Sequence, residues 1–352
     1  MNVVPCRMKL GAVALVAGLA LGPTGGSAET PEEFYKGKQI DLFVSVAAGG
    51  NGIYARPLAR YIRRHLPGNP NVVIKEMAGA GGLTLANYMA QTAPKDGLAI
   101  ATVNRGILID PLLKTPAANY DASKFLSIGS LGTEISICAT MAQARADTIQ
   151  KAREADVVLG SIGPTTITTT YPHLLNATIQ TKFKVITGYP TTQEIMLAME
   201  RREVDGVCLS YGTLNTNKPD WIPGKKVNVL AQFSFAPHPE LKNVPTLRDL
   251  VKDATAQKMV EFYTMPDEMA RPYFAPAGVP ADRLMALRKA FGETLKDPDF
   301  IAEAQQLKME IDYMSGEDME LKLNNLYAIP QATIQQVIDA LAKERELNAL
   351  KK

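Results

Sequence analysis

The chain has 352 residues, of which 46% are hydrophobic and 21% charged. This length and composition allow two domains with sizeable cores and exclude a disordered or collagen-like chain. Lysine and arginine number 38 against 36 aspartate and glutamate residues, so we expect no binding to nucleic acid or to an anionic membrane surface. Three cysteines exclude a disulfide scaffold, and three scattered histidines argue against a histidine-based metal site.

The first 28 residues have the pattern of a secretory signal peptide. Arg7 and Lys9 form a positive start, residues 10–21 are apolar, and residues 26–28 are small. The apolar stretch is shorter than the roughly 20 residues that span a bilayer. We therefore expect a soluble, periplasmic mature protein that begins at or close to Glu29; an uncleaved N-terminal anchor is the alternative.

Beyond this segment, short apolar runs alternate with helical patterns. In the first part of the chain we expect helices at 31–35, 53–66 and 83–92, which alternate with strands at 39–46, 71–77 and 98–103. Further along we expect strands at 157–161, 183–187 and 204–209, which alternate with helices at 167–176 and 192–201. From Pro280 onward the pattern is mostly helical. The alternation predicts an α/β fold with mostly parallel sheets and helices on both faces.

Four of the strand-to-helix junctions consist of small or hydroxyl residues, namely 48–52, 78–82, 161–166 and 189–192. In a parallel sheet, such junctions lie at the edge where ligands bind, and the N–H groups of helix starts favour an anion. For any one of these junctions, the alternative is a tight connection between strand and helix that binds no ligand. The candidate ligand-binding residues are Ala48, Gly49, Gly50, Asn51, Gly52, Ala78, Gly79, Ala80, Gly81, Gly82, Asn104, Ser161, Gly163, Thr165, Thr166, Tyr189, Thr191, Thr192 and Asp205.

The sequence gives little support for catalysis. Gly79 and Gly81 begin a dinucleotide-binding pattern, but its third glycine position is Thr84 and the next strand ends without an acid. Residues 160–163 lack the spacing of a nucleophile elbow. With no matched base and nucleophile, we expect a protein that holds an acid without transforming it, and we expect no catalytic residue and no cofactor.

Several motifs, in this order along the chain, resemble those of the solute receptors of tripartite tricarboxylate transporters, the Bug family. They are Ala-Gly-Gly-Asn-Gly at 48–52, Pro-Gly-Asn-Pro at 67–70, Met-Ala-Gly-Ala-Gly-Gly at 77–82, Ala-Pro-Lys-Asp-Gly at 93–97, Gly-Tyr-Pro at 188–190, Val-Pro-Thr at 244–246 and Pro-Ala-Gly-Val-Pro at 276–280. The resemblance covers essentially the whole chain after residue 28.

The resemblance implies a two-lobed periplasmic binding protein of the type II, hinge-closing kind. It places residues 29–134 and 233–352 in the first lobe and 135–232 in the second. It further implies a monomer that captures a small carboxylate-bearing organic acid and delivers it to the membrane permease subunits of a tripartite transporter. In that family the first two glycine loops, here 48–52 and 78–82, bind a carboxylate, partly through ordered water. A secreted enzyme acting on a small acid and a ligand-presenting partner of a sensor kinase are the alternatives.

Two positions depart from the family pattern. The first loop commonly ends in an aspartate, where this chain has Gly52, and the following helix contains Pro57. Because proline lacks an N–H group, we expect Pro57 to kink or shorten that helix. Cys138 and Cys208 lie in strands expected near the hinge of the second lobe, so they are candidates for a disulfide in an oxidising compartment, with two buried free thiols as the alternative.

Overall fold

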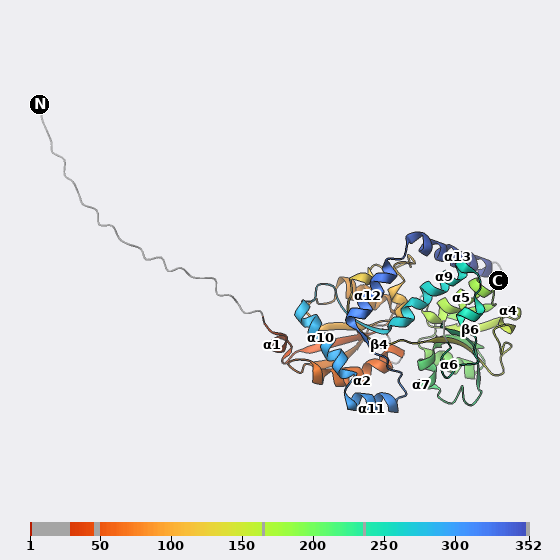
Figure 1. Ribbon diagram of the computed structural model, residues 1–352, viewed down its shortest axis with the longest axis horizontal. Coiled ribbons are helices and arrows are strands. Elements are labelled where there is room, and N and C mark those ends of the chain that lie inside the picture. Colours follow the sequence, from red (N-terminus) through yellow and green to blue (C-terminus); the bar gives the residue numbers. More distant parts are fainter. Residues whose placement is uncertain (2–28, 46–49, 164–165, 235–236, 350–352) are drawn as a thin grey trace.

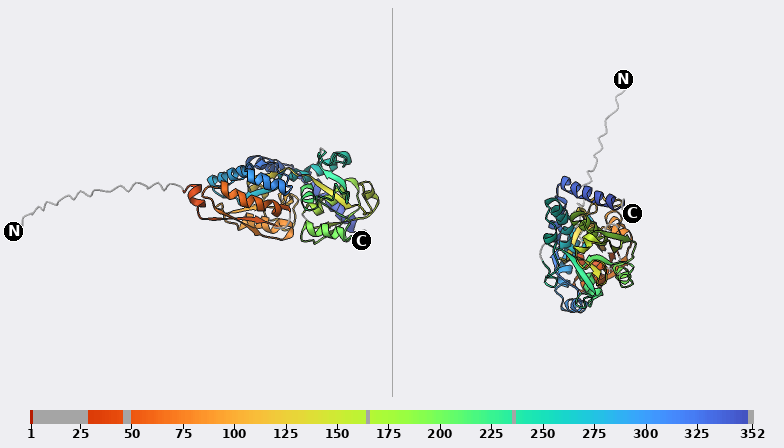
Figure 2. Two further views of the ribbon diagram at one scale, coloured as in Figure 1. Left: turned by 90° about the horizontal axis from the view of Figure 1, so that it is seen from below. Right: turned by 90° about the vertical axis from the view of Figure 1, so that its right-hand side faces the viewer.

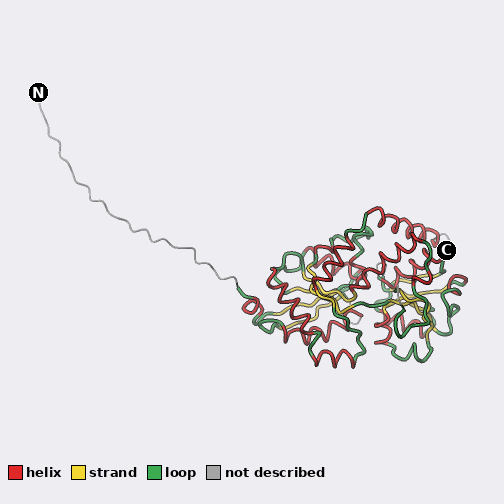
Figure 3. The backbone as a smooth tube through the Cα atoms, viewed as in Figure 1, coloured by secondary structure: helices red, strands yellow, loops and turns green. Residues whose placement is uncertain are grey.

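The computed structural model shows two α/β lobes side by side along the long axis of the molecule (Figure 1, Figure 2). It describes residues 29–45, 50–163, 166–234 and 237–349, together with Met1. Strands lie in the interior of each lobe and helices cover them (Figure 3). None of the helices within these ranges is long and apolar enough to cross a membrane.

The first lobe is built on a six-stranded sheet with the order β11-β4-β10-β3-β1-β2. Its strands are β1 (Gln39–Val44), β2 (Asn71–Glu76), β3 (Ala99–Thr102), β4 (Leu126–Gly132), β10 (Ala270–Ala275) and β11 (Met314–Ser315). Strand β1 pairs in parallel with β2 and β3, whereas β10 runs antiparallel between β3 and β4. Its helices are α1 (Pro31–Tyr35), α2 (Gly50–His65), α3 (Leu83–Gln91), α10 (Ala281–Thr294), α11 (Pro298–Gln306) and α12 (Gly316–Tyr327), with 3-10 turns η1 (Ala80–Gly82), η2 (Arg105–Leu108) and η3 (Ala122–Lys124).

The second lobe is built on a five-stranded sheet with the order β7-β6-β8-β5-β9. Its strands are β5 (Ser136–Met141), β6 (Val157–Ser161), β7 (Phe183–Thr187), β8 (Gly206–Ser210) and β9 (Val227–Phe233). Strand β6 is parallel to β7 and β8, and β5 runs antiparallel between β8 and β9. Its helices are α4 (Lys151–Glu154), α5 (Ile167–Ile179), α6 (Thr192–Glu200), α7 (Tyr211–Asn217), α8 (Leu247–Leu250) and α9 (Ala254–Thr264).

The chain passes between the lobes at the hinge. It leaves the first sheet between β4 and β5, and it returns through the 3-10 turn η4 (Met265–Met269), which leads into β10. These two segments touch, because Glu134 N donates a hydrogen bond to Asp267 O at 3.1 Å. A later connection between α12 and α13 (Gln331–Ala349) carries the C-terminal helix back onto α5 of the second lobe (Figure 1).

The packing after β9 favours a lobe boundary that differs from the expected one at 232/233. Thr246 forms a bridge with Gln232, α8 contacts β9, and α9 contacts α5, so these segments pack on the second lobe. We therefore propose that the second lobe extends to about Thr264. The boundary expected at 232/233 follows from the family resemblance, because a pattern of apolar residues identifies a helix but not the sheet on which it packs.

One apolar core continues from lobe to lobe on the side of the C-terminal helix. It includes Phe274 of β10, Leu326 of α12, Val337 of α13, Leu174 of α5 and Val260 of α9, all buried. Burial of apolar surface contributes about 25 cal/mol per Å², so this shared core holds the lobes together on one side.

Sequence patterns located the strands that pair in parallel better than those that pair only in antiparallel. Strands β6 and β7 have the expected bounds. A strand at Cys138 is expected without bounds and is β5, whereas β4, β9 and β10 are not predicted; the antiparallel pairing of these four strands makes both sheets mixed. Helix α2 begins three residues earlier than expected, at Gly50, and Pro57 lies inside it without ending it. The missing N–H of Pro57 therefore removes one internal hydrogen bond and leaves the helix continuous.

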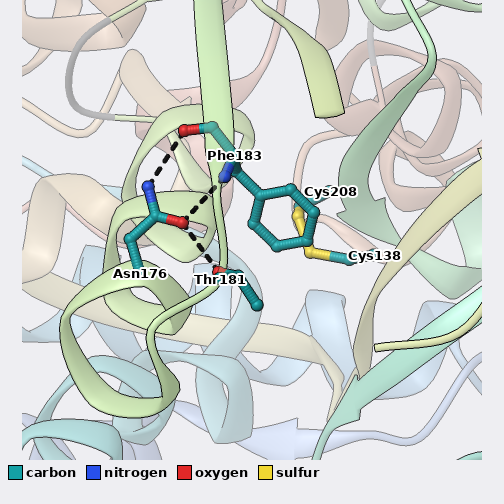
Figure 4. The surroundings of a disulfide bond; sticks show 5 residues. All are labelled: Cys138, Asn176, Thr181, Phe183 and Cys208. Atoms are coloured by element: carbon teal, nitrogen blue, oxygen red, sulfur yellow. Dashed lines mark hydrogen bonds between the residues drawn. A yellow bond between two sulfur atoms is a disulfide. The ribbon is translucent and has the colours of Figure 1, made fainter. Parts of the chain in front are cut away.

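A disulfide joins the two central strands of the second lobe. Cys138 of β5 and Cys208 of β8 face each other directly in the strand register, and both are buried (Figure 4). Phe183, at the start of β7, lies beside the bond (Figure 4). Asn176 fixes this strand to α5, because its side-chain amide donates to Phe183 O and accepts from Phe183 N, both at 3.0 Å.

Removal of the disulfide should lower the free energy of unfolding by about 4 kcal/mol, since a crosslink across 70 residues restricts the unfolded chain by roughly that amount. Urea unfolding of the Cys138→Ala/Cys208→Ala variant measures the loss. Reductant should bring the wild-type protein to the same midpoint and leave the variant unchanged. Equal stability of the two proteins, or two reactive thiols in unreduced, denatured mature protein, would contradict the bond.

Candidate functional site

A cavity of about 270 Å³ lies between the two lobes and is lined by both. The first lobe contributes Ser45, Asn51, Ala78, Gly79, Ala80, Gly81, Gly82, Asn104, Arg105, Gly106, Glu134 and Arg271. The second lobe contributes Ile162, Thr166, Ile167, Thr168, Tyr189, Pro190, Thr191, Thr192, Leu209, Ser210 and Thr213. Its volume is near the lower limit of small-molecule sites, which range from about 300 to 1,000 Å³.

The starts of five helices border this cavity, two from the first lobe and three from the second. They are the starts of α2 and α3 in the first lobe and of α5, α6 and the short α7 in the second. The first N–H groups of a helix have no acceptor within it, and the helix dipole makes this end partially positive. The cavity is therefore suited to an anion, which uncharged N–H groups would hold.

The loop before α3 has a backbone that only small residues tolerate. Gly79, Ala80, Gly81 and Gly82 have φ angles of 138°, 47°, 70° and 108°, all in a region that L side chains rarely adopt. All four residues line the cavity. Asn104, which follows β3 and also lines the cavity, donates from Nδ2 to Gly81 O at 2.9 Å. Its side chain therefore helps to hold this loop in place.

The loop before α2 is described only in part. Ala48 and Gly49 lie outside the described residues, while Gly50 begins α2 and Asn51 lines the cavity. The Nδ2 group of Asn51 is buried and has no hydrogen-bond partner among the described residues. Gly52 is buried in the first turn of α2 and is not in the cavity wall.

In the second lobe a hydroxyl residue stands at the start of each of two helices, and one of the two, Thr191, caps its helix. Thr166 precedes α5 and donates from Oγ1 to Gly163 O at 2.9 Å, and Thr191 precedes α6 and accepts from Glu194 N at 3.2 Å. Tyr189 and Thr192 line the cavity with them, and Thr165 lies outside the described residues. These hydrogen bonds satisfy one orphan donor of α6 and fix the loops that enter the cavity.

Three expected site residues have other surroundings. Ser161 is buried beneath the wall, where its hydroxyl shares a hydrogen bond with Thr168 Oγ1 at 2.8 Å. Gly163 faces the opposite loop, and a Cβ atom added there would lie 3.7 Å from Gly81 N. The structure does not bring Asp205 to the cavity: it precedes β8, and its Oδ2 accepts from Val158 N at 2.8 Å.

The hinge end of the cavity carries a charged cluster, which comprises Arg105, Glu134, Asp267 and Arg271. Glu134 accepts from Arg271 Nη1 and Nη2 at 2.7 and 2.8 Å and from Arg105 Nη1 at 3.0 Å. Arg105 Nη2 donates to Ser136 Oγ, and Arg105 Nε lies 2.5 Å from Asp267 Oδ1. Arg105, Glu134 and Arg271 are the charged residues in the described cavity wall. Sequence patterns carry no signal for a buried, paired charge, so none of these four residues is among the candidate ligand-binding residues named from the sequence.

Burial governs the protonation of this cluster. It raises the pKa of Asp267 to about 7, although Arg105 and the hydroxyl of Tyr171 oppose the shift. Burial also holds the pKa of Tyr171 well above its usual value, so this hydroxyl stays protonated and donates to Asp267 Oδ1 at 2.7 Å. Burial opposes the charge of Arg105, but Asp267, Tyr171 and Glu134 outweigh it and raise its pKa.

Metal binding has no support in the described residues. Within them, no group of three or more histidine, cysteine, aspartate or glutamate side chains is placed to hold an ion.

The substitution Glu134→Gln should lower the free energy of unfolding by about 3–5 kcal/mol, because it leaves two buried arginines without their shared carboxylate. The matched control is Glu303→Gln, which breaks a surface pair with Arg60 and should cost about 1 kcal/mol or less. Urea unfolding of both variants measures the difference. Equal losses would show that the cluster is not the main ionic support of the hinge.

Comparisons with known proteins agree with this geometry. The structure of the periplasmic binding protein BugD is similar, with a TM-score of 0.69 and 22% identity over 88% of this chain and 98% of that one. MatC from Rhodopseudomonas palustris with bound malate gives a TM-score of 0.64 and 17% identity, with coverage of 86% and 99%. A further R. palustris protein with adipate gives 0.66 and 16%, with coverage of 85% and 97%. These likenesses show the two-lobed fold.

Among curated protein sequences, none matches this chain. A family model described as "Tripartite tricarboxylate transporter family receptor" matches residues 54–338. That match covers both lobes and the whole hinge, and the chain therefore belongs to the receptors of the tripartite tricarboxylate transporter family.

Proposed function

We propose that this protein captures a small carboxylate-bearing acid between its lobes and delivers it to the permease subunits of a tripartite transporter. The observation that carries the proposal is the convergence of five helix starts, two from the first lobe and three from the second, on one cavity. Ligands in the relatives fit the same chemistry, since MatC was solved with malate and another R. palustris protein with adipate. The proposal assigns no chemical step and no cofactor.

The proposed anion contacts are the N–H groups of 48–52 and 78–82 in the first lobe and the loops before α5 and α6 in the second. Each charge-assisted hydrogen bond from such a donor contributes roughly 1.5–3 kcal/mol. Because both lobes supply donors, an acid bound between them favours the closed arrangement over the open one. Asn104 supports the second loop in this scheme, and Ser161 acts through Thr168.

The proposed site should prefer acids without an ammonium group. At position 52 a glycine replaces the aspartate common in the family, and Glu134, the carboxylate in the wall, is engaged by two arginines. The described cavity wall therefore offers no unpaired carboxylate to a ligand ammonium group. A thermal-shift panel that pairs succinate with aspartate and adipate with 2-aminoadipate tests this. A larger shift from the amino acids would contradict it.

The Gly52→Asp substitution should weaken binding of a dicarboxylate more than that of a monocarboxylate of equal length, because the new charge repels both ligand charges. Gly52→Asn is the matched control, since it adds the same volume without the charge. Calorimetric titration of succinate and butyrate against the three proteins gives the comparison. Equal losses in the Asp and Asn variants would place position 52 outside electrostatic reach of the ligand.

We further propose that the mature protein is a periplasmic monomer. The signal pattern of residues 1–28, which lie outside the described residues apart from Met1, supports a start at Glu29. Intact-mass measurement of protein from the periplasmic extract should give the mass of 29–352. Retention of residues 1–28, or recovery in the membrane fraction, would contradict this localisation.

A further inference from the structure

Helix α7 of the second lobe packs against the charged cluster of the first. Gly212, its second residue, is buried at this contact. A Cβ atom added there would lie 3.1 Å from Glu134 Oε1, 3.3 Å from the hydroxyl of Tyr54 and 3.6 Å from Arg271 Nη2. The first two distances are shorter than ordinary van der Waals contact, so a side chain at this position would force the groups across the seam between the lobes to shift by a few tenths of an ångström.

The groups that face Gly212 cannot easily move away. Glu134 Oε1 accepts from Arg271 Nη2, and its other oxygen accepts from both arginines. Tyr54 lies under Arg271, with 3.6 Å between the guanidinium carbon and the ring centre, and its hydroxyl accepts from Glu310 N at 3.3 Å. Both Tyr54 and Glu134 are buried. Additional atoms at position 212 would therefore push the lobes apart before they displaced these groups.

Neither the backbone nor the helix requires a glycine here. Gly212 is not among the glycines with positive φ, so an L residue can adopt its conformation. Within a helix, glycine is less favourable than alanine by about 1 kcal/mol. The contact across the seam is the feature of the structure that alanine would disturb.

We infer that Gly212 is a positioning residue for lobe closure. Because it has no side chain, it sets how closely the second lobe approaches the hinge. It is not part of the cavity wall, but Ser210 and Thr213 beside it are, so it acts on the ligand indirectly, through the distance between the lobes and the placement of α7. This inference rests on the proposed function, in which the lobes close over the acid. A Cβ atom added at Gly163, in the other glycine-lined approach of the lobes, would lie at an ordinary contact distance of 3.7 Å from Gly81 N, so of these two positions the one in α7 is the tighter.

Spin labels on Lys75→Cys in β2 and Lys184→Cys in β7 report the separation of the lobes. Distance distributions are recorded by double electron–electron resonance for wild type, Gly212→Ala and Gly212→Val, without ligand and with saturating malate or adipate. The wild type should gain a short-distance population with acid. The alanine variant should show less of it and the valine variant least, and the affinity for both acids should fall by the same factor, at least tenfold for valine.

Thermal unfolding of the ligand-free variants separates closure from folding. Gly212→Ala should unfold at the same temperature as wild type or higher, because alanine favours the helix. The control Asn324→Ala, at an exposed position on α12, gains the same helix preference and should bind acid normally.

Equal short-distance populations and equal affinities in wild type and Gly212→Val would overturn the inference. If neither acid binds the wild type, the proposed function fails for these acids, and the ligand-free distances decide instead. The inference then predicts a longer mean distance in Gly212→Val than in wild type, and identical distances would overturn it.

Discussion

The shared carboxylate of Glu134 is the interaction on which the rest of the structure depends. Two arginines converge on it, Arg271 from β10 and Arg105 from the turn after β3. Glu134 lies on the segment that leaves the first lobe, and Asp267, bonded to its backbone, lies on the segment that returns. A single buried ionic cluster thus fixes both segments of the chain that form the hinge. It also forms the hinge end of the cavity and the surface on which helix α7 packs.

The chemistry of the cavity follows from the pairing of these charges at the hinge. Buried charges are costly unless they are paired, and here the charges of the described wall are engaged with one another at the hinge. The remaining wall offers helix starts, hydroxyls and amides, which hold an anion without a dedicated basic side chain. Under the proposed function, selectivity arises from how the two lobes meet, because loops from both lobes bind one ligand together.

Local sequence patterns predicted the parallel strands of each lobe and the loops that face the cavity. Strands β6 and β7 stand at their expected bounds, and 78–82 lines the cavity because its small residues permit a run of positive φ angles. The central strands β5 and β10 lack the alternating pattern of a half-buried strand, because both of their faces are buried.

Long-range packing could not be deduced from the sequence alone. Arg271 takes a φ of 57° within β10, an unusual conformation that its ion pair and the Tyr54 ring maintain. Asp205, expected within a strand at 204–209, lies before β8, whereas Asn104 lies after β3. Only the residue after the strand lies at the edge where the helix starts converge, and the cavity accordingly contains Asn104 and not Asp205.

Native mass spectrometry of protein purified from the periplasm without refolding tests the central claim most directly. The predicted result is one small molecule per chain, released unchanged on denaturation, with a mass and fragmentation pattern that identify a carboxylic acid. A bound molecule without an acidic group, or a cavity that stays empty even after incubation with a broad panel of carboxylic acids, would contradict the assignment of this cavity to an acid.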